Sequence, residues 1–347
     1  MGQDCSAAVC PGAESGVVTT YETRPKSDNG PLDMQAPAAV GGQVNSTTAR
    51  NFAPDDAREN EDRGGVSARG EGSMSSVSYN YFEKESEELR FVPPGPNPKV
   101  KESRATYTFR TGATYTGQWL GSARHGQGTQ EWTDGSKFEG EWVDNKAHGK
   151  GRFLHADGDI YVGEWVNNCA QGCGIYYYKN HTTYEGQWVN DMQEGHGVER
   201  WAEGSKYEGQ FVAGKKEGFG VYHWADGSTF QGRWRANKIH GSGTYSGGDQ
   251  RKYVGQWESS VMHGRGSYHW ADGRMYMGEY VKDKKEGFGI FVWKDGRRYE
   301  GWWRNGKQDG LGRFVLKTGV SRLAEWREGV RVRWMEDDSA SKDASKS

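Results

Sequence analysis

The chain has 347 residues, of which 33% are hydrophobic, and its 45 basic and 47 acidic side chains give a formal charge of −2. This balance does not favour nucleic acid as a partner, and four cysteines are too few for a disulfide framework. The apolar fraction is low for a packed globule, but 52 glycines accompany 15 tryptophans and 18 tyrosines. The composition therefore indicates a thin, extended fold with an aromatic core.

The first residues match a lipidation pattern. After removal of Met1, Gly2 is the terminal residue and Ser6 lies four positions further on, which is the spacing of N-myristoylation. A single myristoyl chain binds membranes only marginally, and Cys5 is well placed to carry a second, palmitoyl chain, with Cys10 as a reserve. The chain shows no secretory signal and no apolar run of membrane-spanning length, so we expect it in the cytosol.

Residues 1–105 form a leader that we expect to be disordered, because they are rich in small and charged residues and cannot bury enough apolar surface to offset the entropy of ordering. Two stretches depart from this composition. Residues 79–89 begin with Tyr-Asn-Tyr-Phe and predict a short helix or a docking motif. Residues 92–98 contain four prolines and predict a stiff, extended linker.

A strict repeat follows the leader. Each unit begins with an aromatic residue, has a glycine two positions later and a second aromatic four positions later, and the units recur every 23 residues. Further along each unit lies a Gly-x-Gly, and an acidic residue followed by glycine closes most units. The nine leading aromatics are Tyr115, Phe138, Tyr161, Tyr184, Tyr207, Phe230, Tyr253, Tyr276 and Tyr299.

Incomplete units flank the nine complete ones. Residues 106–114 align with the second half of a unit, and residues 322–334 align with the first half of one but lack the Gly-x-Gly. The repeat region therefore spans residues 106–334, and residues 335–347 form an acidic, serine-rich tail that we expect to be disordered.

The spacing of the repeat predicts an all-β fold. Positions two apart in a strand share a face, so the leading aromatic, the glycine and the second aromatic lie together, and we expect rings from the neighbouring strand to cover the glycine. We interpret Gly-x-Gly as a structural turn and the acid-Gly pair as a tight turn with positive φ. Nine hairpins in succession give an elongated, single-layer, twisted meander on the order of 85–90 Å long, from about 4.8 Å per strand.

The chemistry of the repeats does not indicate an enzyme. Gly-x-Gly occurs without the lysine and hydroxyl residue of a phosphate-binding loop, and no nucleophile stands beside a base. Histidines before Gly-x-Gly recur on hairpins about 10 Å apart, too far to share a metal ion. Cys169 and Cys173 lack partnering histidines at zinc spacing, so we interpret them as structural residues or free thiols. We expect no catalytic residue, no metal and no cofactor.

Lysines cluster near the predicted Gly-x-Gly turns and form a candidate basic edge for anionic lipid headgroups or an acidic partner, although ordinary solubilising charge is the simpler interpretation. These candidate contacts are Lys146, Lys215, Lys216, Lys238, Lys284 and Lys285.

The terminal unit combines arginine with tryptophan, a composition that is enriched in protein interfaces. A sheet also leaves an unpaired strand at its end, where other chains can pair. The candidate terminal interface consists of Trp326, Arg327, Arg331, Arg333 and Trp334.

The unit Tyr-x-Gly-x-Trp-x₆-Gly-x-Gly-x₅-Asp-Gly, present with aromatic substitutions from Phe138 to Gly158 and from Tyr207 to Gly227, resembles the MORN (membrane occupation and recognition nexus) repeat. The chain is similar to MORN scaffolds of protist cortical and inner-membrane complexes, which are often dimeric. The resemblance implies protein partners from the cytoskeleton or a membrane complex, binding to a membrane lipid surface, and a homodimer.

Together with the lipidation pattern, the resemblance leads us to expect a membrane-tethered scaffold at the cytoplasmic face of the plasma membrane or a cortical inner membrane. Two alternatives stay open. One is an axonemal protein of the cilium that resembles radial-spoke-head subunits. The other is a regulatory MORN subunit of a lipid kinase or another enzyme.

Overall fold

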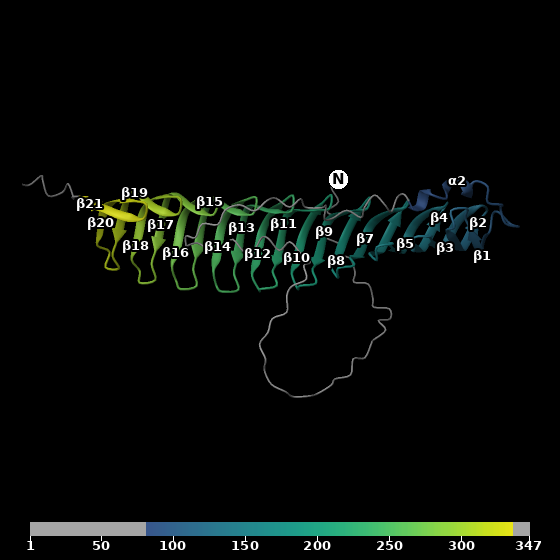
Figure 1. Ribbon diagram of the computed structural model, residues 1–347, viewed down its shortest axis with the longest axis horizontal. Helices are drawn as coiled ribbons and strands as arrows, with labels where there is room; N and C mark the ends of the chain where they lie inside the picture. Colours follow the sequence, from purple (N-terminus) through teal and green to yellow (C-terminus); the bar gives the residue numbers. More distant parts are fainter. Residues whose placement is uncertain (1–80, 336–347) are drawn as a thin grey trace, which may run out of the picture. The chain divides into compact units, whose positions relative to one another are not determined.

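The computed structural model describes residues 81–335. They include the short helix α2 (Ser86–Leu89), preceded by helical residues 81–83, and 21 strands in a single open antiparallel sheet. Each strand between β1 and β21 pairs with the strand before it and the strand after it in the chain, and these two end strands each pair on one side. Figure 1 shows this meander, with the strands side by side in chain order. The predicted all-β, elongated sheet of tandem hairpins is therefore confirmed.

Each repeat contributes a seven-residue strand and a nine-residue strand. The sheet starts with β1 (Lys101–Thr108) and ends with β21 (Val330–Trp334). The seven-residue strands are β2 (Thr114–Leu120), β4 (Lys137–Val143), β6 (Ile160–Val166), β8 (Thr183–Val189), β10 (Lys206–Val212), β12 (Thr229–Arg235), β14 (Lys252–Glu258), β16 (Met275–Val281), β18 (Arg298–Arg304) and β20 (Ser321–Arg327). The nine-residue strands are β3 (Ala123–Glu131), β5 (Lys146–Leu154), β7 (Cys169–Tyr177), β9 (Met192–Arg200), β11 (Lys215–His223), β13 (Lys238–Ser246), β15 (Val261–His269), β17 (Lys284–Val292) and β19 (Lys307–Val315).

The tight turn inside each repeat is not the Gly-x-Gly that the sequence suggested. In the second repeat it is Asp144-Asn145, with φ of 48° and 70°, a two-residue turn of the primed type that joins β4 to β5. Asparagine and aspartate tolerate this left-handed conformation and can replace glycine there. The Gly-x-Gly lies within β5, where a β-bulge shifts the register and Gly149 adopts a φ of 65°.

The second connection, between repeats, follows the prediction. Gly135 adopts a φ of 88° and donates its N–H to the carbonyl of Trp132, 3.0 Å away, while the N–H of Trp132 bonds the carbonyl of Ser136. This is a three-residue hairpin loop that ends in a left-handed glycine. Where the acid-Gly pair is missing, His181 and Gln250 adopt the same conformation, with φ of 66° and 70°.

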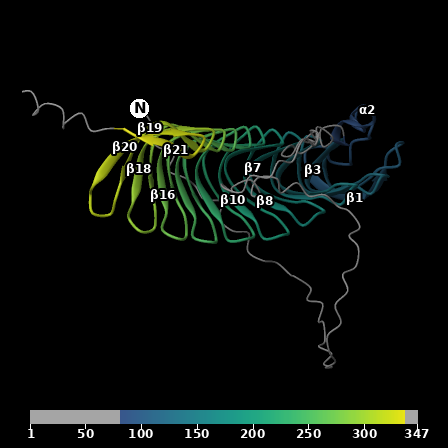
Figure 2. The same ribbon diagram turned by 60° about the vertical axis from the view of Figure 1, so that its left-hand side comes forward.

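One face of the sheet, the inner face, carries the leading aromatic and the second aromatic of each repeat. Tyr161 is 0% exposed and Trp165 is 1% exposed. A single-layer sheet buries rings this deeply only on the inside of its curvature, and Figure 2 shows that the hairpins bend. The two rings meet edge to face at 5.2 Å, and the indole N–H of Trp165 donates to the carbonyl of Gly151 in the preceding strand.

The ring that covers each repeat glycine differs from the one we expected. The expectation was a ring from the neighbouring strand, but the leading aromatic of the same strand lies there. A Cβ added to Gly209 would meet the Tyr207 hydroxyl at 2.6 Å, and one added to the paired Gly220 would meet the same ring. The Tyr207 hydroxyl donates to the carbonyl of Gln210, three residues on, which holds the ring along its own strand.

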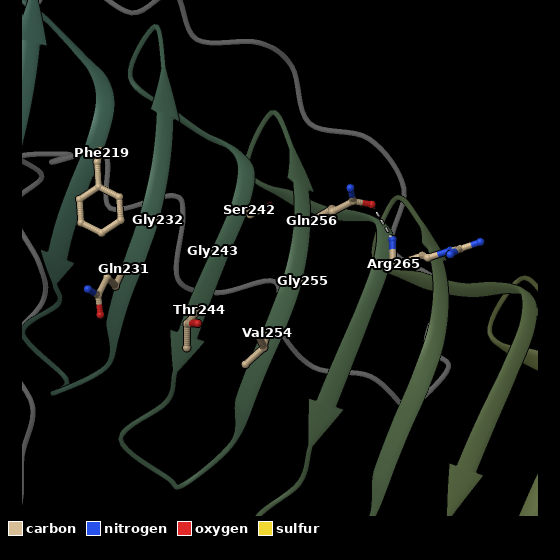
Figure 3. Close-up of a pocket in the computed structure, with 10 residues that line it drawn as sticks. All are labelled: Phe219, Gln231, Gly232, Ser242, Gly243, Thr244, Val254, Gly255, Gln256 and Arg265. Atoms are coloured by element: carbon tan, nitrogen blue, oxygen red, sulfur yellow. Dashed lines mark hydrogen bonds between the residues drawn. The ribbon is translucent and has the colours of Figure 1, made fainter.

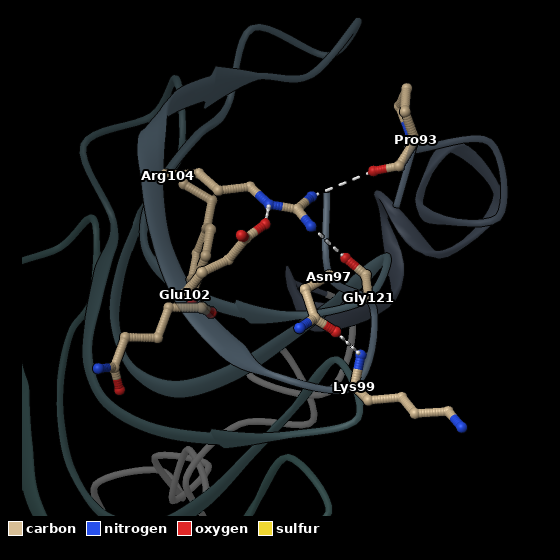
Figure 4. Close-up of polar contacts among 8 residues, drawn as sticks. Pro93, Asn97, Lys99, Glu102, Arg104 and Gly121 are labelled. Carbon is tan, nitrogen blue, oxygen red and sulfur yellow. Dashed lines mark hydrogen bonds and ion pairs between the residues drawn. The ribbon is translucent and has the colours of Figure 1, made fainter. Parts of the chain in front are cut away.

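Described secondary structure already precedes the sequence-based boundary between residues 105 and 106. Residues 81–92, including α2, pack on the inner face, and β1 starts at Lys101. Figure 4 shows how Arg104 in β1 ties the proline-rich stretch to the sheet: its guanidinium donates to the carbonyls of Pro93 and Gly121 and pairs with Glu102. Residues 81–83 and 86–89 are helical, so the described part of the expected helix in residues 79–89 is present, with a turn at residues 84–85.

Candidate functional site

The inner face contains aromatic boxes, and the second residue after the tight turn determines what fills those of the second, fifth and eighth repeats. In the eighth repeat this residue is Lys285, which is only 6% exposed. Its ammonium lies 5.1–5.7 Å from the ring centroids that line the box, at a distance that permits cation–π attraction. The rings are Trp270, Tyr276, Phe291 and Trp303.

Lys216 fills the equivalent box three repeats earlier. Its ammonium lies 2.6 Å from a carboxylate oxygen of Glu199 and 4.9 Å from the centroid of Trp201. The expectation that Lys216 and Lys285 form part of an exposed basic edge is therefore wrong. Each is the second residue of its strand and pairs with an inner-face residue, so its side chain turns inward.

The box of the second repeat is filled from outside the repeats. Its central residue is Ala147, which leaves the space open, and Phe82 occupies it. Phe82 is 2% exposed and lies 5.4–5.8 Å from five surrounding rings, including Phe138 and Trp165. The neighbouring Tyr81 donates its hydroxyl to Asp134 at 2.6 Å. The stretch before the repeats thus completes the core of the first units.

The remaining four candidate lysines are exposed, as the sequence predicted. Lys146, Lys215, Lys238 and Lys284 each begin a nine-residue strand, next to a tight turn, and their side chains are exposed. They lie on the face opposite the rings, the outer face. The residues opposite Lys146, Lys215 and Lys284 across the turn are valines that are 38–50% exposed. This edge therefore presents ammonium groups beside apolar side chains.

The outer face follows a local rule of its own. Counting the leading aromatic as position 1, position 4 is glutamine or glutamate in most repeats. In five of them its side-chain oxygen accepts the N–H of the residue between the two glycines of Gly-x-Gly. For example, Gln118 accepts from Gln127 at 2.9 Å and Gln210 accepts from Phe219 at 2.8 Å. The bond satisfies a donor that the bulge removes from the strand ladder.

An open hollow of about 530 Å³ lies on the outer face across β11 to β15 (Figure 3). It exists because β13 presents only the small side chains Ser242 and Thr244 there, between the Phe219 ring and Arg265. Its lining residues contain no carboxylate and no nucleophile beside a base.

The terminal unit divides its candidate residues between the two faces. Trp326 packs edge to face on Tyr299 at 5.3 Å, as the second aromatics of the repeats do, and so lies half-buried on the inner face. The Trp334 ring centroid lies 4.1 Å from the guanidinium carbon of Arg331 and 4.7 Å from that of Arg322. Arg327 is 73% exposed, and Arg333 pairs with a neighbouring glutamate in β20.

The buried titratable groups are structural. Burial raises the pKa of the Tyr299 hydroxyl to about 12, and that hydroxyl donates to the carbonyl of Trp302. Burial likewise raises the pKa of the Cys169 thiol to about 11, which makes it a poor nucleophile, and Cys169 is a free cysteine. Within residues 81–335 no group of three or more histidine, cysteine or acidic side chains is placed to hold a metal ion.

The lipidation candidates Gly2, Cys5 and Cys10 lie outside the described residues, as does the tail after Met335. Among the helices of residues 81–335, none is long and apolar enough to cross a membrane.

Comparison with known proteins identifies the repeat. No curated protein matches this sequence significantly. Among solved structures, the TCP domain of SAS-4 from Drosophila melanogaster, in complex with a proline-rich motif of Ana2, is 11% identical and aligns over 58% of this chain and 90% of its own, with a TM-score of 0.25. A mutant TCP10 domain of CPAP from Danio rerio is 15% identical, over 59% and 97%, with a TM-score of 0.22.

The MORN repeat model matches nine consecutive segments, which together cover more than half of the sequence. The segments are 115–137, 138–160, 161–183, 184–206, 207–229, 230–250, 253–273, 276–297 and 299–321. Their boundaries coincide with the β-hairpins of the sheet and with the leading aromatics, so the chain belongs to the MORN repeat family.

Proposed function

We propose that this protein is a non-enzymatic scaffold that links a membrane face to cytoskeletal or membrane-complex proteins. MORN repeats are known in membrane-associated and protein-binding scaffolds and are generally non-catalytic. The observation that carries the proposal is the division of the sheet into two faces. The inner face is filled by its own rings and by Phe82, Lys216 and Lys285, while the outer face and its edges expose charged and apolar side chains along the sheet. Recognition therefore takes place on a surface rather than in a catalytic pocket.

The membrane end of the scaffold is the acylated leader. Gly2 carries a myristoyl chain and Cys5 a palmitoyl chain, and both are required for stable membrane residence, because one chain alone binds only marginally. Metabolic labelling with an alkyne myristate, followed by membrane fractionation, tests this directly. We expect label on the wild-type protein, no label on Gly2→Ala, and label without stable membrane association on Cys5→Ser. An unlabelled wild-type protein, or Gly2→Ala that fractionates like wild type, contradicts the proposal.

The lysines of the outer edge support the tether. Each lysine beside an anionic leaflet contributes about 1 kcal/mol. Lys146, Lys215, Lys238 and Lys284 are all exposed, the first, second and fourth beside valines and Lys238 beside Arg235. Replacing these four by glutamine should weaken sedimentation of the protein with phosphatidylserine vesicles but not with phosphatidylcholine vesicles. If the wild-type protein and the four-lysine variant sediment equally with both kinds of vesicle, these lysines do not bind the membrane and only solubilise the protein.

The protein end of the scaffold includes the terminal unit. The edge strand β21 pairs with β20 on one side, and Val330 and Val332 are 67% and 51% exposed. An exposed, β-branched edge strand favours the addition of a strand from a partner protein. Arg327→Glu combined with Arg331→Glu should reduce proximity labelling of cytoskeletal or membrane-complex proteins in the native cell, without changing membrane fractionation. A labelling pattern identical to wild type would reduce β21 to a cap.

A further inference from the structure

The aromatic box of the third repeat lacks a filling side chain of the kind that Phe82 and Lys285 provide elsewhere. Counting the leading aromatic as position 1, the central residue of each box is position 10, and only the second and third repeats have alanine there. Phe82 occupies the space above Ala147, but within residues 81–335 no ring or cation from outside the repeats enters the space above Ala170. The rings that line this space are His155, Tyr161, Tyr176 and Trp188.

The rings of this box are nevertheless buried. Tyr161 is 0% exposed, and Trp188 is 1% exposed, as is Trp165, on which Phe82 lies. A single-layer sheet has no second layer to shield rings of this size around an alanine such as Ala170, so without a cover they would be in contact with water. The burial therefore indicates a cover that comes from the chain before the first described residue.

The chain before the repeats reaches one box further along the sheet with every three residues. Glu85 is 1% exposed and accepts an N–H of Gln130, which itself pairs with Arg124, the central residue of the first box. Phe82, three residues earlier, fills the box of the second repeat. Consecutive boxes are two strands apart, about 9.6 Å, and three residues of extended chain span about 10 Å. One more step of three residues, from Phe82 to Tyr79, therefore reaches the box of the third repeat.

His155 gives this box a polar requirement. Five repeats have tryptophan at position 18, whereas the second repeat has histidine there. His155 is 8% exposed, and its Nε2 is buried without a hydrogen-bond partner, an arrangement that destabilises a fold. Burial lowers the pKa of His155, so its ring is neutral at neutral pH and Nε2 can accept a hydrogen bond. A tyrosine in the box would bring both a ring for the apolar space and a hydroxyl for this nitrogen.

We propose that Tyr79 of the leader docks in the box of the third repeat, with its ring over Ala170 and its hydroxyl donating to Nε2 of His155. Tyr79 lies two residues before the first described residue and is the only aromatic residue of the stretch 75–80. The docked stretch fixes the point at which the leader leaves the sheet and closes the inner face of the first three repeats to other chains. The proposal goes beyond the scaffold function and does not depend on acylation.

Ala170→Ile tests this docking by filling the box from within. Isoleucine is the central residue of the sixth repeat, where Ile239 is 1% exposed, so the fold accepts it at this position. It takes the space that the ring of Tyr79 needs. Val77→Ala is the matched control, because it shortens a side chain of the same stretch and leaves the tyrosine in place. The full chain carrying Gly2→Ala, which cannot be myristoylated, provides the background.

Hydroxyl-radical footprinting with mass spectrometry gives the readout, because it reports the exposure of a single side chain. The protection factor of residue 79 is its modification rate in a synthetic peptide of residues 71–85 divided by its rate in the folded protein. We expect a factor of about ten or more in the background protein, which corresponds to a docking free energy of about 1.4 kcal/mol. Val77→Ala should keep this protection, and Ala170→Ile should reduce it to about one while circular dichroism shows an intact sheet.

The hydroxyl of Tyr79 has its own test. Tyr79→Phe keeps the ring but removes the donor, and the protection factor of residue 79 should fall roughly fivefold, as for the loss of one hydrogen bond. In a His155→Phe background, which lacks the acceptor, the same substitution should cause no such fall. A protection factor near one in the background protein, protection that Ala170→Ile leaves unchanged, or an equal effect of Tyr79→Phe with and without His155 would overturn the proposal.

Discussion

Replacing Gly209 by valine tests the packing that makes the repeat possible. A Cβ at this position would lie 2.5 Å from the Cα of Gly220 in the paired strand and 2.6 Å from the Tyr207 hydroxyl. The first contact is with backbone, which cannot move aside without separating β10 from β11. The second displaces the ring whose hydroxyl bonds the carbonyl of Gln210. Valine adds two further methyl groups to the same space.

The magnitude follows from these two contacts. Overpacking a tight core costs about 1–3 kcal/mol, and loss of the tyrosine hydrogen bond costs about 1 kcal/mol more. Together they lower the stability by about 2–4 kcal/mol, and at roughly 2–4 °C per kcal/mol for a region of this size the melting temperature falls by about 5–15 °C.

Two controls separate packing from backbone conformation. Gly227 has a φ of 82°, and a Cβ added there would meet open space. Gly227→Ala should therefore lower the free energy of unfolding by only about 1–2 kcal/mol, through strain of the left-handed backbone. Lys215 is exposed beside a turn, and Lys215→Ala should stay within about 0.5 kcal/mol of wild type. Melting is followed by tryptophan fluorescence and circular dichroism. Equal melting temperatures for Gly209→Val and Lys215→Ala would refute the assignment of Gly209 to the packed inner face.

Three further outcomes are expected. Phe82→Ala should release residues 81–92 from the inner face, seen as faster hydrogen exchange there, with a local loss of about 3–5 kcal/mol; unchanged exchange would contradict this. Small-angle scattering of a fragment spanning residues 81–335 should give a maximum dimension on the order of 95 Å or more, from about 4.8 Å per strand, and a compact particle would not fit. Burial lowers the pKa of His155, so the unfolded chain binds its proton more readily and stability should fall as the pH drops below about 6.5; His155→Tyr should reduce this loss, and an unaltered pH profile would exclude His155 as its source.

The inner face could be predicted from the sequence because its residues satisfy one geometric condition. Tyr161, Gly163 and Trp165 share a face by the period of a strand, and the strict spacing of 23 residues requires the same arrangement in every unit. Which ring covers each repeat glycine could not be predicted in the same way. It depends on the rotamer of the leading aromatic, which lies along its own strand. In the tyrosine repeats its hydroxyl also bonds a carbonyl three residues on, but Phe138 and Phe230, which have no hydroxyl, cover their glycines in the same way.

The lysines of the turn edge show where the sequence pattern misled. Gly-x-Gly has the composition of a turn, so Lys215 and Lys216 were both assigned to solvent beside it. The turn actually lies at residues 213–214, and the two lysines are the first residues of β11. Neighbouring residues of a strand point to opposite faces, so Lys215 is exposed and Lys216 enters an aromatic box. The signal that distinguishes them is the pair of left-handed residues, which are often Asn or Asp rather than glycine.

The filled boxes limit where a partner can bind. A peptide that entered the inner face would have to displace a side chain that already occupies it, such as Lys285 among its four rings or Phe82 above Ala147. Either displacement exposes buried rings to water or leaves a buried ammonium without its partners. The free energy lost in this way exceeds the free energy that contact with an exposed surface of the same area would gain. The outer face carries no such penalty, because its side chains only alternate between solvent and a partner. Differences in binding between repeats should therefore map to positions 2 and 4 of the seven-residue strands, where the sequence varies while the packed positions stay constant.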